Sequence, residues 1–195
     1  DRALLLDFQA TLETKPEKAI KLEKDALAQI ENITADNARL VSNLHANLGG
    51  LYRMNGYPDL AREHMEKSIS LLDQFNLLHI NDSIPQIANY AMFLTEQQEP
   101  ERGISELQKL SGIIKEYHSD DCLDYAKVQE TLGTIYLMTA NLPQAKTHFK
   151  RAFKIYEKIW ADEPEMIEAK YQEIQELYPQ IGFCIGKNLS GLLTK

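Results

Sequence analysis

The feature that most constrains this chain is a repeat of fixed length. Residues of similar size recur every 42 positions, and no insertion interrupts the pattern over four units. Four sets of residues show the period: Pro16, Pro58 and Pro100; Ala19, Ala61, Gly103 and Ala145; Glu23, Met65, Leu107 and Phe149; and Gly49, Ala91 and Gly133. A constant period of this length predicts a solenoid of stacked helical hairpins, since each unit buries its apolar face against its neighbours.

Small residues in the period predict where the two helices of a hairpin cross. The set that contains Gly49 falls on the first helix of each hairpin, and the set that contains Ala19 falls on the second. Two helix axes approach to about 8–10 Å only where the side chains at the contact are small. The prolines stand at the start of each second helix, where the missing N–H costs nothing and φ is already set. The first of these helices is expected to run from Pro16 to about Ile33.

The run Leu132-Gly133-Thr134-Ile135-Tyr136, followed by Ala145, Phe149 and Ala152, resembles the tetratricopeptide repeat. The usual period of that family is 34 residues, so this one is longer by about two helical turns, or roughly 12 Å. With Asn-Leu-Gly/Ala-x-Leu-Tyr in its first helix, the longer unit resembles the kinesin light chain type of repeat. The resemblance covers roughly residues 1 to 160. It implies an all-α, right-handed solenoid of antiparallel helical hairpins, and it leaves the function open because such repeats serve many partners.

One domain spanning residues 1–195 is expected. Its approximate units are 1–33, 34–77, 82–117 and 120–160, followed by a C-terminal helical cap or degenerate unit at 162–195. Extending the period predicts a fifth pair of helices there, but Gln175, Lys187 and Gly191 replace the packing residues of the earlier units. The C-terminal segment therefore either caps the solenoid or stacks on a further repeat. Because the chain begins inside a predicted helix, we expect it to be part of a longer protein.

Composition argues against several classes of partner. The net charge of −8 and the isoelectric point near 5.2 argue against nucleic acid, which needs a basic stripe. No apolar run approaches the ~20 residues of a membrane span. The two cysteines, Cys122 and Cys184, form no metal-binding pattern and fit a reducing cytoplasmic setting. We therefore expect a cytoplasmic protein that binds neither nucleic acid nor membrane.

No set of residues in the sequence suggests catalysis, a metal or a cofactor. The five histidines have no second ligand at metal spacing and are expected to be structural or solvated: His45, His64, His79, His118 and His148. The acidic run Asp120-Asp121-Cys122-Leu123-Asp124 lacks the spacing and closing glutamate of a calcium loop, and carboxylates are favoured at a helix N-terminus. The sequence contains no glycine-rich phosphate loop and no nucleophile elbow. A non-enzymatic protein is the expectation.

Residues that the repeat does not need for packing are the candidates for binding. In such a superhelix the first helices line the concave side, where one register reads Asn47, Asn89 and Thr131. An asparagine carries a donor and an acceptor, so it can pair with both backbone groups of an extended peptide. In the kinesin light chain type, asparagines at this position contact cargo peptides, which implies the same for Asn47 and Asn89, with Thr131 a partial substitute. The alternative is that these asparagines bond a neighbouring helix and bind nothing.

Neighbouring registers complete the predicted groove. Arg53 and Lys127 would favour an acidic group, and Gly50, Met92 and Met138 would offer an adaptable apolar floor. The candidate peptide-binding residues are Asn43, Asn47, Gly50, Arg53, Asn89, Met92, Lys127, Thr131 and Met138.

Three functional hypotheses follow. The first is a non-enzymatic interaction scaffold that binds an extended peptide or partner helix in its concave groove. The second is a peptide-sensing regulatory domain of a larger bacterial transcription factor or signalling ATPase, which an upstream helix-turn-helix or nucleotide-binding segment would identify. The third is a self-assembly module, in which the apolar segment 181–195 pairs between copies to form a homo-oligomer.

Overall fold

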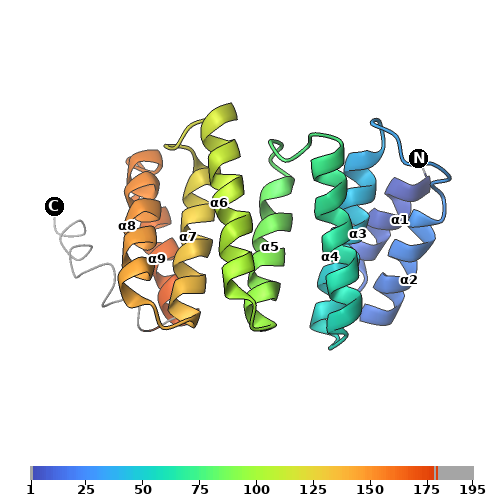
Figure 1. Ribbon diagram of the computed structural model, residues 1–195, viewed down its shortest axis with the longest axis horizontal. Coiled ribbons are helices and arrows are strands. Elements are labelled where there is room, and N and C mark those ends of the chain that lie inside the picture. Colours follow the sequence, from blue (N-terminus) through green and yellow to red (C-terminus); the bar gives the residue numbers. More distant parts are fainter. Residues whose placement is uncertain (1, 178, 180–195) are drawn as a thin grey trace. The chain divides into compact units, whose positions relative to one another are not determined.

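The structure, a computed structural model, describes residues 2–177 and residue 179. Within these residues the chain forms nine α-helices and no strand (Figure 1). The helices are α1 (Arg2–Leu12), α2 (Pro16–Leu27), α3 (Ala38–Met54), α4 (Pro58–Gln74), α5 (Ser83–Glu96), α6 (Pro100–Tyr117), α7 (Leu123–Met138), α8 (Leu142–Ile159) and α9 (Pro164–Leu177). They form two compact units, Asp1–Phe93 and Leu94–Lys195.

The second helix of each hairpin begins where the period predicts. α2, α4 and α6 begin at Pro16, Pro58 and Pro100, and α8 begins one further period along the chain, at Leu142. In α8 the proline follows one position later, at Pro143, still inside the first turn, where no helical hydrogen bond needs its N–H. The regular spacing of these four starts confirms the period found in the sequence.

The end of α2 corrects one expectation. The helix predicted to reach about Ile33 ends at Leu27. The backbone N–H of Ile30 bonds to the carbonyl of Leu27, three residues back, at 3.0 Å, which tightens the chain into a turn. Further on, the side chain of Asn37 accepts a hydrogen bond from the backbone N–H of Thr34 at 2.8 Å. Such local side-chain bonds offer the backbone an alternative to the helix.

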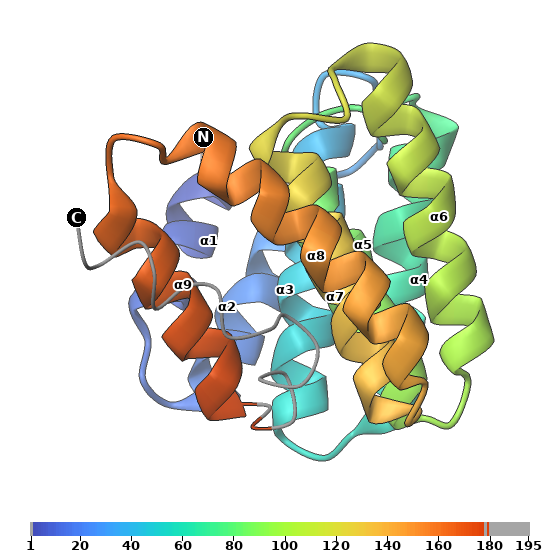
Figure 2. The same ribbon diagram turned by 90° about the vertical axis from the view of Figure 1, so that its left-hand side faces the viewer.

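In the first unit α1 pairs with α2 and α3 pairs with α4, and α2 also packs against α3 (Figure 2). The α3–α4 pair crosses at Gly49. A Cβ atom at this position would lie 2.6 Å from Cγ of Met65 and 3.3 Å from the carbonyl oxygen of Ala61. A methyl group at this position would force the side chain of Met65 to move, so the small-residue crossing predicted from the sequence is confirmed in this hairpin.

The turn inside three of the hairpins also repeats. Gly56, Gln98 and Ala140 follow one another at intervals of one period, and their φ angles are +76°, +66° and +58°. These values lie in the left-handed region, which glycine enters freely and other residues enter at a cost. The backbone of the turn is therefore kept even where the sequence has no glycine.

In the second unit α6 packs against α7, α7 against α8 and α8 against α9. The carboxylate of Glu130 on α7 accepts hydrogen bonds from the hydroxyl of Tyr156 at 2.5 Å and from Nζ of Lys170 at 3.2 Å. This carboxylate links α7 to both α8 and α9. The segment 181–195, predicted to cap the solenoid or to pair between copies, lies outside the described residues.

Candidate functional site

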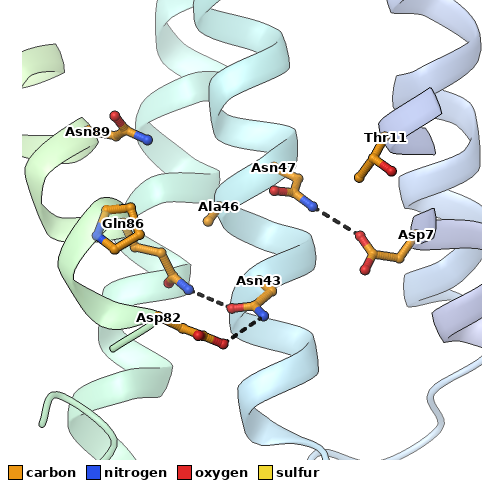
Figure 3. A pocket seen from close by; sticks show the side chains of 9 residues that line it. Asp7, Thr11, Asn43, Ala46, Asn47, Asp82, Gln86 and Asn89 are labelled. Atoms are coloured by element: carbon orange, nitrogen blue, oxygen red, sulfur yellow. Dashed lines mark hydrogen bonds between the residues drawn. The ribbon is translucent and has the colours of Figure 1, made fainter. Parts of the chain in front are cut away.

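The candidate site is a polar pocket of about 300 Å³ in the first unit (Figure 3). Its walls come from α1, from α3 and from the first half of α5 with the residue before it. The lining residues are Asp7, Thr11, Asn43, Ala46, Asn47, Asp82, Pro85, Gln86 and Asn89. Both α3 and α5 are first helices of their hairpins, and the repeat predicts binding residues on such helices.

Helical spacing explains which side chains of α3 line the pocket. Asn43 and Asn47 are four positions apart, so they lie on one face of the helix. Leu44 and Leu48 follow them by one position, and both are fully buried. The apolar face of α3 is thus held in the core, and this fixes the two asparagines on the face that lines the pocket.

Asn47 is held by two carboxyl groups. Its side-chain nitrogen donates to Oδ1 of Asp7 at 3.0 Å and to Oε1 of Glu23 at 3.1 Å, so both of its N–H groups are used. Among the described residues no donor reaches its amide oxygen. Asn47 therefore bonds neighbouring helices through its nitrogen, as one interpretation of the sequence predicts, and keeps an acceptor for a ligand.

Glu23 is a buried acid behind the pocket. Its side chain is 1% exposed, and its Oε2 atom has no hydrogen-bond partner in the described part of the chain. Burial, and then the negative charge of Asp7, raise the pKa of Glu23 to about 8, although the hydrogen bond from Asn47 lowers it. Burial therefore favours the protonated form of Glu23. The sequence does contain a signal for this residue: Glu23 is a charged residue in the register that Met65 and Phe149 occupy in later units.

Gln86 fixes the opposite side of the pocket. Its Nε2 donates to Oδ1 of Asn43 at 2.6 Å, and its Oε1 accepts from the hydroxyls of Ser42 at 2.8 Å and Ser68 at 2.5 Å. Asn43 in turn lies 3.5 Å from Oδ2 of Asp82. Both ends of the Gln86 amide are engaged, so this wall is set before a ligand arrives. Sequence reasoning missed Gln86, and its position in the first turn of an expected helix carries no clear signal.

Three of the nine predicted residues meet in this pocket: Asn43, Asn47 and Asn89. Asn89 is exposed, and its side chain makes no hydrogen bond to any described residue. Figure 3 shows Asn89 on α5 and Asp7 on α1, with Asn47 between them. The amide of Asn89 is therefore open to a ligand on both its donor and its acceptor side.

Three other predicted residues belong to the first unit but do not line the pocket. Gly50, Arg53 and Met92 are half-buried. Around Gly50, a Cβ atom would meet nothing within 4 Å, so space is open there.

The remaining three predicted residues lie on α7, in the second unit. The hydroxyl of Thr131 donates to the carbonyl of Lys127 at 3.0 Å and so is used within its own helix. The exposed ammonium of Lys127 lies 3.8 Å from the carboxylate of Asp124. Met138 is 42% exposed at the end of the helix.

The predicted structural role of the histidines fits three of them. Nδ1 of His45 and Nδ1 of His64 are 2.9 Å apart, so one ring donates to the other across the α3–α4 pair. Burial, the neighbouring His64 and Lys67 lower the pKa of His45 to about 4. His148 bonds to Gln129 at 2.9 Å in the α7–α8 pair.

Two properties of the described residues bear on function. No group of three or more histidine, cysteine, aspartate or glutamate side chains there is placed to hold a metal ion. None of the described helices combines the length and the apolar character that crossing a membrane requires.

Comparison with known proteins identifies the repeat. Residues 83–158 match the family model described as tetratricopeptide repeat. No curated protein sequence matches the chain.

Solved structures show the fold. The crystal structure of BtubC (BKLC) from P. vanneervenii is similar, with a TM-score of 0.73 and 18% sequence identity over 98% of this chain and 79% of that chain. A kinesin light chain with nearly identical TPR-like repeats from Podospora anserina has a TM-score of 0.65 and 14% identity, over 75% of this chain and 69% of that chain. These likenesses confirm the predicted fold class, an all-α TPR-like solenoid of antiparallel helical pairs.

Proposed function

Because this chain is a tetratricopeptide repeat protein, we propose that it is a non-enzymatic interaction module that holds an extended segment of a partner protein in the pocket of the first unit. Domains of this family generally serve protein–protein interaction. The pocket, at about 300 Å³, has the size for a short stretch of extended chain rather than for a helix. We place the protein in the cytoplasm, which fits its free Cys122.

The observation that carries the proposal is the pair of asparagines on successive first helices. Asn47 and Asn89 are one period apart, both line the pocket, and both have an amide oxygen that no described residue contacts. Asn89 also has a free amide nitrogen. A peptide backbone needs acceptors for its N–H groups and donors for its carbonyls, and these two side chains supply both kinds.

The experiment is a selection of peptides from a displayed library with the whole chain, followed by affinity measurement. Asn89→Ala is the informative variant, because its side chain makes no bond within the described protein that the substitution would remove. We expect binding to weaken at least tenfold. Asn47→Ala should weaken it too, but this substitution also removes the bonds to Asp7 and Glu23, so its folding must be checked by circular dichroism.

The matched control is Asn32→Ala, which removes an exposed asparagine side chain from the turn after α2. This variant should bind as the unchanged chain does. If Asn89→Ala and Asn32→Ala bind equally well, the asparagines do not hold the peptide and the proposal fails.

A further inference from the structure

The charge of the pocket restricts what it can hold. Its ionisable lining residues are Asp7 and Asp82, and no lysine, arginine or histidine lines it. Asp82 is already paired, because Nη2 of Arg39 lies 2.6 Å from its Oδ2 atom. Asp7 has no such partner: among the described residues no cationic side chain contacts its carboxylate. Its neighbours are the amide of Asn47 and the buried carboxyl of Glu23.

The carboxyl group beside Asp7 belongs to the buried Glu23. Asn47 donates one N–H to each of the two carboxyls, so they lie side by side. Burial disfavours the charged form of Glu23 and raises its pKa, whereas Asp7 is only half-buried and faces the pocket. Of the two carboxyl groups, the one that a ligand in the pocket can reach is therefore that of Asp7. Oε2 of Glu23 stays without a hydrogen-bond partner among the described residues.

The rest of the pocket suits a cation with several N–H groups. The amide oxygens of Asn47 and Asn89 accept no hydrogen bond from a described residue, and both side chains line the pocket. Figure 3 shows the nitrogen of Asn47 directed at Asp7 and its oxygen on the opposite side, towards α5. An ammonium has three donors and a guanidinium has five, and neither has an acceptor. A carboxylate ligand would meet Asp7 without a compensating cation.

We propose that the pocket binds the side chain of a lysine or arginine in the extended partner segment, with Asp7 as its counter-ion. This inference rests on the proposed function. From Arg53 and Lys127 the sequence predicts an acidic group on the ligand. Neither residue lines the pocket, and the ionisable residues that do line it are acidic, so the pocket favours a basic group instead.

The test uses the displayed peptide library on three forms of the chain: unchanged, Asp7→Asn and Asp25→Asn. Asp25 is an exposed acid on α2, so its substitution removes the same charge away from the pocket. Peptides selected by the unchanged chain and by Asp25→Asn should share a lysine or arginine at one position. Asp7→Asn should bind those peptides at least tenfold more weakly, since it removes the ion pair and keeps the shape of the side chain.

A change in the peptide gives a second readout that needs no protein variant. Replacing the shared lysine or arginine by norleucine should weaken binding to the unchanged chain at least tenfold and should have little further effect on Asp7→Asn. Selected peptides with no shared basic residue, or equal binding by Asp7→Asn, would overturn the inference. If the selected peptides share no basic residue but still bind Asn89→Ala more weakly, this inference fails and the proposed function stands. If no peptide is selected at all, both fail.

Discussion

The α3–α4 and α7–α8 hairpins are two copies of one design, two periods apart, and they differ in instructive ways. Gly49 and Gly133 occupy the same position at the two crossings. A Cβ atom would lie 2.6 Å from Cγ of Met65 in the first copy and 2.9 Å from Cδ2 of Phe149 in the second. The backbone approach is kept while the side chain that fills the space changes. Close helix packing is thus the shared physical requirement, and the side chain that packs against the glycine can vary.

The polar contact across each hairpin varies more than the packing. Tyr52 stacks on His64 with ring centroids 5.4 Å apart, and Tyr136 stacks on His148 at 5.3 Å. The histidine ring is therefore placed alike in both. Its hydrogen-bond partner differs, since His64 bonds to His45 and His148 bonds to Gln129, the residue two periods after His45. The first copy has two titratable groups where the second has one.

The largest expected effect comes from filling the crossings. Gly133→Ala should lower the free energy of unfolding by about 2–3 kcal/mol, because three ring atoms of the buried Phe149 lie within 3.0 Å of the new methyl group. Gly49→Ala should cost about 1 kcal/mol, because the flexible chain of Met65 can move aside. Urea unfolding followed by circular dichroism measures both.

Gly50→Ala is the control for these two changes. It lies next to Gly49 on the same helix, and a Cβ atom there meets nothing within 4 Å. The gain in helix propensity should stabilise the chain by about 0.5–1 kcal/mol. A loss of stability for Gly50→Ala, or none for Gly133→Ala, would show that the crossings do not explain these glycines.

A smaller effect should come from making the two polar contacts alike. His45→Gln gives the first hairpin the glutamine–histidine pair of the second. In the unfolded chain His45 titrates near 6.5, and in the folded chain its pKa is about 4. Between these values the unfolded state binds more protons, so stability is complete above pH 6.5 and falls as the pH is lowered towards 4.

We expect the unchanged chain to lose roughly 1 kcal/mol more than His45→Gln between pH 7 and pH 5, a value reduced from the full linkage because the pair is only half-buried. The comparison of thermal unfolding at the two pH values isolates His45, since Glu23 and the other titrating groups are present in both proteins. Equal losses would mean that the histidine pair does not sense pH.

The same comparison explains how far the sequence could lead. Periodicity records backbone packing, so it predicted the helix starts at Pro58 and Pro100 and the crossing at Gly49. It also placed Asn43, Asn47 and Asn89 on first helices, where they share a pocket. A hydrogen-bond partner depends on which side chains of other helices face the group, and no period encodes that.

The missed residues show this limit. Asp7 lies on α1, one period before Gly49, so the repeat places it in the small-residue register of its hairpin and not among the groove registers. Glu23 stands where later units carry large apolar residues, and only the structure shows that it lies beside Asp7. Lys127, Thr131 and Met138 share the registers of the predicted groove but belong to the second unit. Register places residues on a face of their own helix without placing them in one pocket.

The smallest effect should appear in the turns, where the sequence departs from the backbone that it forms. Gly56 and Ala140 hold the same left-handed conformation at positions two periods apart. Alanine in this conformation costs about 1–2 kcal/mol, whereas glycine costs about 0.5–1 kcal/mol of chain entropy on folding. Ala140→Gly should therefore stabilise the chain by about 0.5–1 kcal/mol, and Gly56→Ala should destabilise it by a similar amount. Thermal unfolding of both variants tests whether the turn keeps its left-handed backbone whichever residue occupies it. The two changes in stability must have opposite signs, because each substitution is the reverse of the other at an equivalent site.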